Sequence, residues 1–449
     1  MPLDLQAITV PTGLAELRFV DLEGDDLEEI LLLGHQPVTG QPDAASLTVV
    51  RTDGTVRTTA LGNRPLVLAP APTGSAGLWA LSGTAWQTWT GERFEVGTAL
   101  ASPLGALGRA TPIFAELTKL VFPDTPTRLA WSKGSYQCVR SYPGAPDGTC
   151  GSIPAPARGE LTASWTQGAQ VLATALTPPP LSVVDANADG FADLLLPDRK
   201  SLAVYLSSAT EIGSRAATWP LPIDLDPEHP PRKAGQTQRE IGEVWFDDLD
   251  GDKRVDLGVL RYVTTGSFFG ATAEWLYAKG TGSGFAAVQT VAMPSAAFGA
   301  QLVDIDGDGD KDLVTGLVDI GMRNLASALI SRVVRAELTV LRLGSSGYGE
   351  PAPLHAVSFP LESPDGFHVD FASDVTGDGR ADLVASEDGE IRVYPGTASG
   401  MDAAAKWTLP LAVPQGQKTL QTHDLDHDGT AEIIVWGKDA GKVWILRGR

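Results

Sequence analysis

The chain has 449 residues, of which 43% are hydrophobic, and a formal net charge of −21. This size and apolar fraction are sufficient for a large core, and no apolar run of 18 residues exists, so we expect no membrane span. A chain this acidic offers no basic stripe to neutralise phosphates, which argues against nucleic acid as a partner.

An acidic nine-residue pattern, Asp-x-Asp-x-Asp-Gly-x-x-Asp followed at once by aliphatic residues, recurs along the chain. The five full copies begin at Asp185, Asp248, Asp304, Asp374 and Asp424. A faded copy begins at Asp21 and has Asp26 where the glycine belongs, so we assign no ion to it and leave metal binding there open. Fixed motifs that recur about every 50 to 70 residues indicate a repeat fold.

The N-terminal half has room for further repeats. Leu3–Val10 alternates like a strand and precedes the faded copy. The interval from Asp21 to Asp185 fits three repeats of about 55 residues, so two units there must have lost their acids. The expected strands are Leu66–Leu68, Gly77–Leu81, Ala85–Trp89 and Arg93–Val96 in one unit, and Thr127–Trp131, Tyr136–Val139 and a strand from Thr149 in the other.

The last unit is one strand short. It offers Leu420–Thr422, Glu432–Trp436 and Lys442–Leu446, and then the sequence stops. We expect Leu3–Val10 to pair with these strands and to close a ring, which would hide the edge strands.

Eight units of about four short strands each predict an all-β fold, an eight-bladed β-propeller formed by a single domain, 1–449. A seven-bladed ring is the alternative and would require one hidden unit to be something else. The approximate blades are 11–60, 61–110, 111–175, 176–235, 236–295, 296–360, 361–412 and 413–449 together with 1–10.

Each full motif predicts a calcium site. Acids at positions 1, 3 and 5 of a tight turn point at one centre, glycine at position 6 allows the reversal, and calcium takes six to eight such oxygen ligands. The carbonyl of position 7 and the acid of position 9 complete the set. The expected ligands of the five sites are Asp185, Asn187, Asp189, Phe191 and Asp193; Asp248, Asp250, Asp252, Arg254 and Asp256; Asp304, Asp306, Asp308, Asp310 and Asp312; Asp374, Thr376, Asp378, Arg380 and Asp382; and Asp424, Asp426, Asp428, Thr430 and Glu432.

Two details qualify this prediction. Thr376 replaces an acid at position 3 of its copy, and Lys253 occupies the glycine position of another. Acidic β-turns without metal are the alternative, since Asp and Gly favour turns anyway, but a common register in five copies disfavours it. Without calcium the clustered acids repel one another, so metal should add folding free energy directly.

The segment from Phe298-Gly299-Ala300 through Asp304 to Asp312-Leu313-Val314 resembles the FG-GAP repeat of integrin α-subunit propellers and the related bacterial VCBS repeats. The resemblance covers roughly residues 180–449. It implies a propeller with calcium loops between the first two strands of each blade. It also implies that ligands bind on the opposite face, which is formed by the loops between strands two and three of each blade and by the loops between blades. Such propellers occur in adhesion proteins, in lectins and as parts of polysaccharide lyases.

The two cysteines, Cys138 and Cys150, flank a hairpin tip at Pro143–Gly148. We expect them to form a disulfide, which presumes an oxidising compartment; two free buried thiols are the alternative. Met1–Asp4 has no leader character. Because the loops require abundant calcium, we expect an extracellular, periplasmic or cell-surface protein whose export signal is absent from this sequence.

Long loops on a rigid scaffold often carry function. The candidates are Gly34–Ser46, Val263–Ala273 and Leu317–Ala336, and in the last of these Asn324–Leu338 reads as a short helix or as lengthened strands. Phe268 and Phe269 would form a platform for a sugar or peptide, unless one simply caps the core.

No Gly-x-Ser-x-Gly elbow, His-Glu-x-x-His or P-loop occurs in the sequence, and we assign no catalytic residue. The sequence therefore favours a monomeric, non-catalytic binding or adhesion module for a protein or glycan ligand. A polysaccharide lyase or hydrolase on the same ring and a structural part of a surface assembly are the alternatives.

Overall fold

The computed structural model describes residues 4–22, 25, 27–36, 44–63, 67–70, 78–82, 85–90, 94–99, 121–122, 125–132, 135–140, 148–154, 160–164, 173–177, 182–190, 193–207, 212–225, 237–265, 271–319, 321–360, 369–371, 373–387, 389–397, 400–414 and 419–448. Their fold is all-β, as predicted, apart from one helix. None of the helical structure in these ranges is long and apolar enough to cross a membrane. The chain divides into two compact units.

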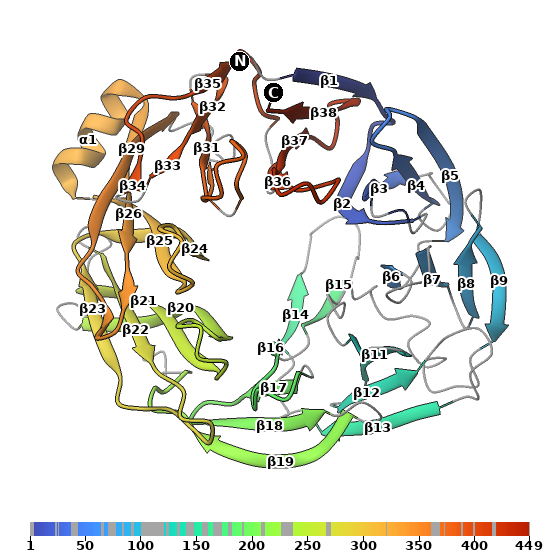
Figure 1. The fold of residues 1–449 in the computed structure, drawn as a ribbon, viewed down its shortest axis with the longest axis horizontal. Coiled ribbons are helices and arrows are strands. Elements are labelled where there is room, and N and C mark those ends of the chain that lie inside the picture. Colours follow the sequence, from blue (N-terminus) through green and yellow to red (C-terminus); the bar gives the residue numbers. More distant parts are fainter. Residues whose placement is uncertain are drawn as a thin grey trace. The chain divides into compact units, whose positions relative to one another are not determined.

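The first unit comprises Met1–Leu14, Pro222–Thr281 and Phe285–Arg449 and carries four four-stranded antiparallel sheets (Figure 1). In sheet order their strands are β20 (Thr237–Asp247), β21 (Asp256–Thr265), β22 (Thr272–Ala278) and β23 (Gln289–Met293); β24 (Ala296–Val303), β25 (Asp312–Val318), β26 (Val333–Leu341) and β29 (Ala352–Pro360); β30 (Val369–Asp370), β31 (Leu383–Glu387), β32 (Glu390–Tyr394) and β35 (Trp407–Leu409); and β36 (Leu420–His423), β37 (Glu432–Trp436), β38 (Lys442–Arg447) and β1 (Asp4–Thr9). Two small hairpins follow the third strands of the middle sheets: β27 (Leu343–Gly344) with β28 (Gly347–Tyr348), and β33 (Gly396–Thr397) with β34 (Gly400–Met401).

The second unit comprises Ala15–Leu221 and Gly282–Gly284. Its sheets are β2 (Leu14–Val20), β3 (Glu29–Gln36), β4 (Ala44–Val50) and β5 (Val56–Asn63); β6 (Val67–Pro70), β7 (Leu78–Ser82), β8 (Ala85–Trp89) and β9 (Phe94–Ala99); β10 (Val121–Phe122), β11 (Thr125–Ser132), β12 (Ser135–Arg140) and β13 (Gly148–Pro154); the pair β14 (Glu160–Ser164) and β15 (Ala173–Thr177); and β16 (Ser182–Val184), β17 (Asp193–Pro197), β18 (Ser201–Ser207) and β19 (Ile212–Pro220). The two units that lack the acidic motif thus still form four-stranded sheets, as the sequence predicted.

Consecutive sheets of the first unit pack face to face through three hydrophobic clusters. Trp275 and Tyr277 of β22 meet Tyr348 of the β27–β28 hairpin in the first cluster. Val314 and Leu338 pack with Leu383 in the second. Val384 and Val393 pack with Ile433 and Leu446 in the third. The central strands are covered on both faces: every residue of β31 and β37 is buried, including the polar Ser386, Glu387 and Glu432.

The N-terminal strand completes the last sheet, as predicted. β1 pairs antiparallel with β38 in a register that sets Asp4 against Arg447 and Thr9 against Lys442. Figure 1 shows β1 beside β38. The pairing continues past the strand, where the Val10 N–H donates to the Gly441 carbonyl over 3.0 Å and the Gly13 N–H to the Lys438 carbonyl over 2.7 Å. The last sheet therefore needs both ends of the chain. The single domain and its blade boundaries stay predictions.

The connection between β25 and β26 contains both structures considered for Asn324–Leu338. Helix α1 (Met322–Ser331) is followed by Arg332 in the left-handed conformation, and β26 then begins at Val333. Leu329 and Ile330 of the helix are 62% and 86% exposed.

The cysteines lie on neighbouring strands of one hairpin. Cys138 is paired in register with Gly151, and the register shifts between Cys138 and Val139, so that Cys150 falls at this irregularity of the β12–β13 ladder. The hairpin is as predicted, and the disulfide stays a prediction. Phe268 and Phe269 lie outside the described residues.

Candidate metal centres

Every full acidic motif connects the first strand of a sheet to the second. The loops that begin at Asp185, Asp248, Asp304, Asp374 and Asp424 lie between β16 and β17, β20 and β21, β24 and β25, β30 and β31, and β36 and β37 respectively. The faded copy at Asp21 takes the same place between β2 and β3. The position implied by the resemblance is thus confirmed.

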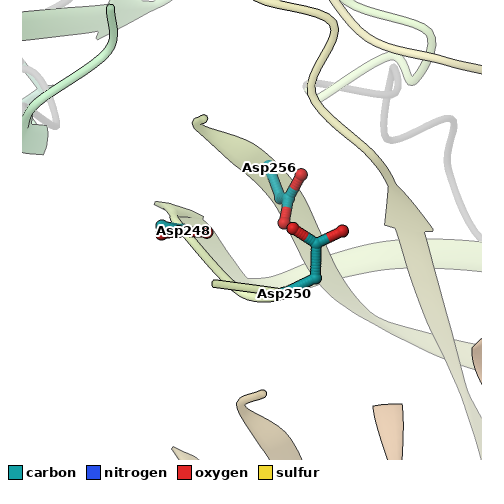
Figure 2. Close-up of side chains that lie close together, drawn as sticks. All are labelled: Asp248, Asp250 and Asp256. Atoms are coloured by element: carbon teal, nitrogen blue, oxygen red, sulfur yellow. The ribbon is translucent and has the colours of Figure 1, made fainter. Parts of the chain in front are cut away.

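Four of the loops gather carboxylates. In each, three acidic residues offer oxygen atoms that all lie within 4.8 Å of one another. Figure 2 shows Asp250 and Asp256 of one cluster with their carboxylates turned toward each other. The clusters are Asp248, Asp250 and Asp256; Asp304, Asp306 and Asp308; Asp374, Asp378 and Asp382; and Asp424, Asp426 and Glu432. The sequence had assigned all twelve residues to metal sites.

The position-1 carboxylate shapes each loop. Asp304 Oδ1 accepts the N–H of Gly307 over 2.7 Å and that of Asp308 over 3.2 Å, while Oδ2 accepts the N–H of Gly309 over 2.9 Å. Asp374 repeats this arrangement with the three equivalent N–H groups of its own loop. Such local side-chain bonds are what makes Asp a turn residue, so the position-1 carboxylate favours this loop conformation.

Two positions per loop require left-handed backbone. The expected glycine at position 6 has φ +93° at Gly309, and Lys253 adopts φ +63° at the same position of its loop. A side chain in this region costs about 1 kcal/mol. Position 4 is also left-handed, including Ala188 and His427, which carry a Cβ. The loop geometry is therefore preserved even where its glycines are lost.

The position-9 acid plays a part that the sequence reasoning missed. These acids, Asp193, Asp256, Asp312, Asp382 and Glu432, are only 0 to 4% exposed. In the Asp374 loop, Asp382 Oδ2 accepts the N–H groups of Val375 over 2.8 Å and Thr376 over 2.7 Å, and Oδ1 accepts that of Gly396 over 2.9 Å. Since Gly396 follows the third strand, the carboxylate fastens the loop to that strand as well as facing the cluster.

The same fastening recurs in other sheets. Asp256 accepts the N–H of Gly280 over 2.6 Å and Asp312 accepts that of Leu343 over 2.8 Å, both donors lying just after a third strand. In the faded copy, Glu29 Oε2 accepts the Leu22 N–H over 2.8 Å. The signal was present in the sequence, because an acid remains at position 9 even where position 6 has lost its glycine.

Burial of these acids perturbs their protonation. Removal from water raises the pKa of Asp312 to about 7, and the charge of Asp306 adds to the effect. Burial likewise raises the pKa of Asp256 to about 6, with Asp250 contributing. Burial thus disfavours the charged form of both carboxylates, and a cation held beside them would favour it.

The residues present fit a hard divalent cation. Asp248 Oδ1 and Asp306 Oδ1 are buried oxygen atoms that accept no hydrogen bond from the described residues, and a buried acceptor left unsatisfied is costly. Ligand sets made of carboxylate and carbonyl oxygens suit calcium. In the Asp185 loop, Asn187 Nδ2 donates to Asp189 Oδ2 over 2.9 Å instead, and Phe191 lies outside the described residues. Calcium at each of the five loops stays a prediction, as do the position-7 carbonyl ligands.

Neighbouring loops are linked by backbone hydrogen bonds. The Lys311 N–H in the Asp304 loop donates to the Leu249 carbonyl in the Asp248 loop over 2.7 Å. The Ala431 N–H in the Asp424 loop donates in the same way to the Asp374 carbonyl over 2.7 Å. These two hydrogen bonds connect each loop to the loop of a neighbouring sheet.

The comparison with known families locates one repeat in the chain. The model of the FG-GAP-like repeat matches residues 374–447. This part of the chain is an FG-GAP-like repeat. It contains the Asp374 and Asp424 loops, and the resemblance stated for the sequence is thereby confirmed there. No curated protein matches the chain.

Several solved structures are similar to the chain at low identity. An Agrocybe aegerita lectin that recognises non-reducing terminal N-acetylglucosamine is 14% identical, with 82% of this chain and 87% of that chain covered and a TM-score of 0.40. The WD40 domain of SCAP from fission yeast is 8% identical, covering 80% and 90%, with a TM-score of 0.35. The rhamnogalacturonan lyase YesW is 15% identical, covering 69% and 57%, with a TM-score of 0.30. TM-scores below 0.5 identify neither a ligand nor an activity for this chain.

Proposed function

We propose that the chain is a calcium-stabilised, eight-bladed β-propeller that acts as a non-catalytic binding or adhesion module outside the cytoplasm. The observation that carries the proposal is the recurrence of carboxylate clusters in one connection, between the first and second strands, of four consecutive sheets. Bound calcium would supply positive charge to these clusters. The loop carboxylates would hold it, while the position-9 acids tie each loop to its sheet.

The sheets support the blade number. The described residues contain eight four-stranded sheets, in the order in which the repeats follow one another in the sequence. The last of them takes its fourth strand from the N-terminus, the arrangement that ring closure requires. A seven-bladed ring would have to leave one of these sheets outside it.

Ligand binding is assigned to the ends of the sheets away from the calcium loops. The connection between the second and third strands after β25 contains helix α1 with its exposed Leu329 and Ile330. Phe268 and Phe269 occupy the corresponding connection after β21. Exposed apolar residues among polar neighbours are typical of sites for a protein or glycan ligand.

The calcium part is tested by thermal unfolding of the purified protein in EDTA and in millimolar calcium, with metal analysis of the protein as isolated. We expect several calcium ions per chain and a clear rise in the unfolding temperature. If the protein carries no calcium and unfolds at the same temperature in both buffers, the proposed calcium sites are refuted. The argument for an exported protein, which depends on them, is then refuted too.

The binding part is tested on a glycan array that includes terminal N-acetylglucosamine and polygalacturonate, with calcium present. The matched variant is Leu329→Ser with Ile330→Ser, which changes only exposed side chains and should leave the unfolding temperature unchanged. Binding that the variant loses supports the assigned face. Binding that the variant retains places the ligand elsewhere, and release of shortened or unsaturated sugar products would favour the lyase alternative.

A further inference from the structure

Three of the four third strands of the first unit lead into a basic residue that contacts an acidic loop, and the fourth leads into a proline. These equivalent residues are Lys279 after β22, Arg342 after β26, Pro395 after β32 and Arg447 at the end of β38. In the first three, the next residue donates its N–H to the position-9 acid, as described for Gly280, Leu343 and Gly396. The hydrogen bond of the next residue therefore fixes the backbone at Lys279, Arg342 and Pro395 next to the acidic loop.

Lys279 reaches furthest into its loop. Its ammonium forms an ion pair and hydrogen bond with Asp250 Oδ2 and lies 3.1 Å from Asp252 Oδ2. Both acids were assigned to the metal site of the Asp248 loop. The side chain of Asp250 is only 12% exposed, whereas that of Lys279 is 47% exposed, so the ammonium approaches the carboxylates from the solvent side.

The surroundings hold Lys279 in place. The Ala286 N–H donates to the Lys279 carbonyl over 2.8 Å. Two residues earlier, Tyr277 packs edge-on against Tyr348 with ring centroids 5.1 Å apart. The backbone of Lys279 is thus held in place before its side chain pairs with Asp250 and Asp252. Less conformational entropy is therefore lost when the ion pair forms.

The equivalent residues of the other sheets make weaker or different contacts. Arg342 Nε lies 3.4 Å from Asp306 Oδ2, and its Nη2 is buried without a hydrogen bond among the described residues. Pro395 has no charge to offer. Arg447 Nε donates to Glu432 Oε1 over 3.0 Å, which is the position-9 acid and not a residue of positions 1 to 5. The Asp248 loop also departs from the others in carrying Lys253 at the glycine position.

We propose that the ammonium of Lys279 serves as a resident cation of the Asp248 loop, competing with calcium for Asp250 and Asp252, so that this loop binds calcium more weakly than the Asp304, Asp374 and Asp424 loops. The inference rests on the proposed calcium sites. Its physical basis is that one charge cluster cannot hold an ammonium and a divalent ion on the same oxygen atoms. Calcium must displace Lys279, and its apparent affinity falls by the stability of the contact that it breaks.

The test is Lys279→Met in the full chain, compared with wild type by calorimetric titration of the metal-free protein with calcium. We expect the variant to gain one tight site or to show one site tightened roughly tenfold, the size expected for a hydrogen bond between charged groups. Adding Asp248→Asn to the Lys279→Met variant should remove the gained site and so assign it to this loop. Lys442→Met is the charge control, because Lys442 is exposed at the far end of β38 from Arg447, and it should titrate like wild type.

A second measurement separates this inference from the calcium proposal. In EDTA, Lys279→Met should unfold at a lower temperature than both wild type and Lys442→Met, because Asp250 and Asp252 lose the ammonium that pairs with them. Lower stability in EDTA without any calcium binding to either protein would uphold the ion pair of Lys279 but overturn both the calcium proposal and the competition inferred here. Titrations and EDTA unfolding temperatures equal to those of wild type would overturn the role of Lys279.

Discussion

Replacing Asp382 by alanine is expected to destabilise the protein whether or not calcium is present. The carboxylate is 1% exposed and accepts three backbone N–H groups, from Val375, Thr376 and Gly396, at 2.7 to 2.9 Å. Hydrogen bonds to a charged acceptor contribute about 1.5 kcal/mol each at the lower end of their range. Burial of the acid, which also raises its pKa, offsets part of this sum. We therefore expect a net loss of about 3 kcal/mol.

The assay is urea unfolding in EDTA, followed by tryptophan fluorescence and circular dichroism, with Asp378→Ala as the matched control. Asp378 is exposed at position 5 of the same loop, where its Oδ1 accepts the Arg380 N–H over 3.1 Å. In EDTA its removal should cost about 1 kcal/mol or less, the value of an exposed hydrogen bond. Equal losses for the two variants in EDTA would refute the fastening role of position 9, since a residue that acts only as a metal ligand matters only when metal is bound.

Three further predictions follow from the same geometry. The pKa of Asp312 is raised from 3.8 to about 7 on folding, so its contribution to metal-free stability is complete below pH 3.8 and is lost as the pH rises through 7. The calcium-induced rise in unfolding temperature should therefore be larger at pH 8 than at pH 5. A calcium-induced rise that is smaller at pH 8 than at pH 5 would contradict this prediction. Replacing Asp306 and Asp308 together by alanine should lower the unfolding temperature in calcium and change it little in EDTA, and an unchanged response to calcium would mean that this loop is not a significant site. Mass spectrometry of a non-reduced digest should find Cys138 and Cys150 in one linked peptide pair, whereas alkylation of both without reductant would exclude the disulfide.

The loops and their flanking strands were predictable because their signals are local. Asp304 bonds N–H groups three to five residues ahead of it, and the apolar run that follows at Leu313 and Val314 begins the buried second strand. The pairing of β1 with β38 was predictable for a different reason. A repeat that is one strand short at the C-terminus, together with an unassigned strand at the N-terminus, leaves one partner for each.

The choice between helix and strand for Asn324–Leu338 was not predictable from its spacing. Apolar residues three and four apart allowed both, and the chain uses both, because β26 needs Val333–Leu341 to pair with β25 and β29. The residues before it have no strand partner and form α1. Tertiary pairing, and not local propensity, decided where the helix ends.

The amino-acid sequence by itself determined the all-β class, the repeats and the positions of the acidic loops, since each of these is written in neighbouring residues. Tertiary structure alone decided the second role of the position-9 acids and the contact of Lys279 with Asp250. Asp312 accepts an N–H from Leu343, 31 residues away, and Lys279 lies 29 residues beyond Asp250. Every residue other than proline has a backbone N–H, so the sequence does not show which residue will donate to the position-9 acid. The donor is determined only when the third strand packs against the loop.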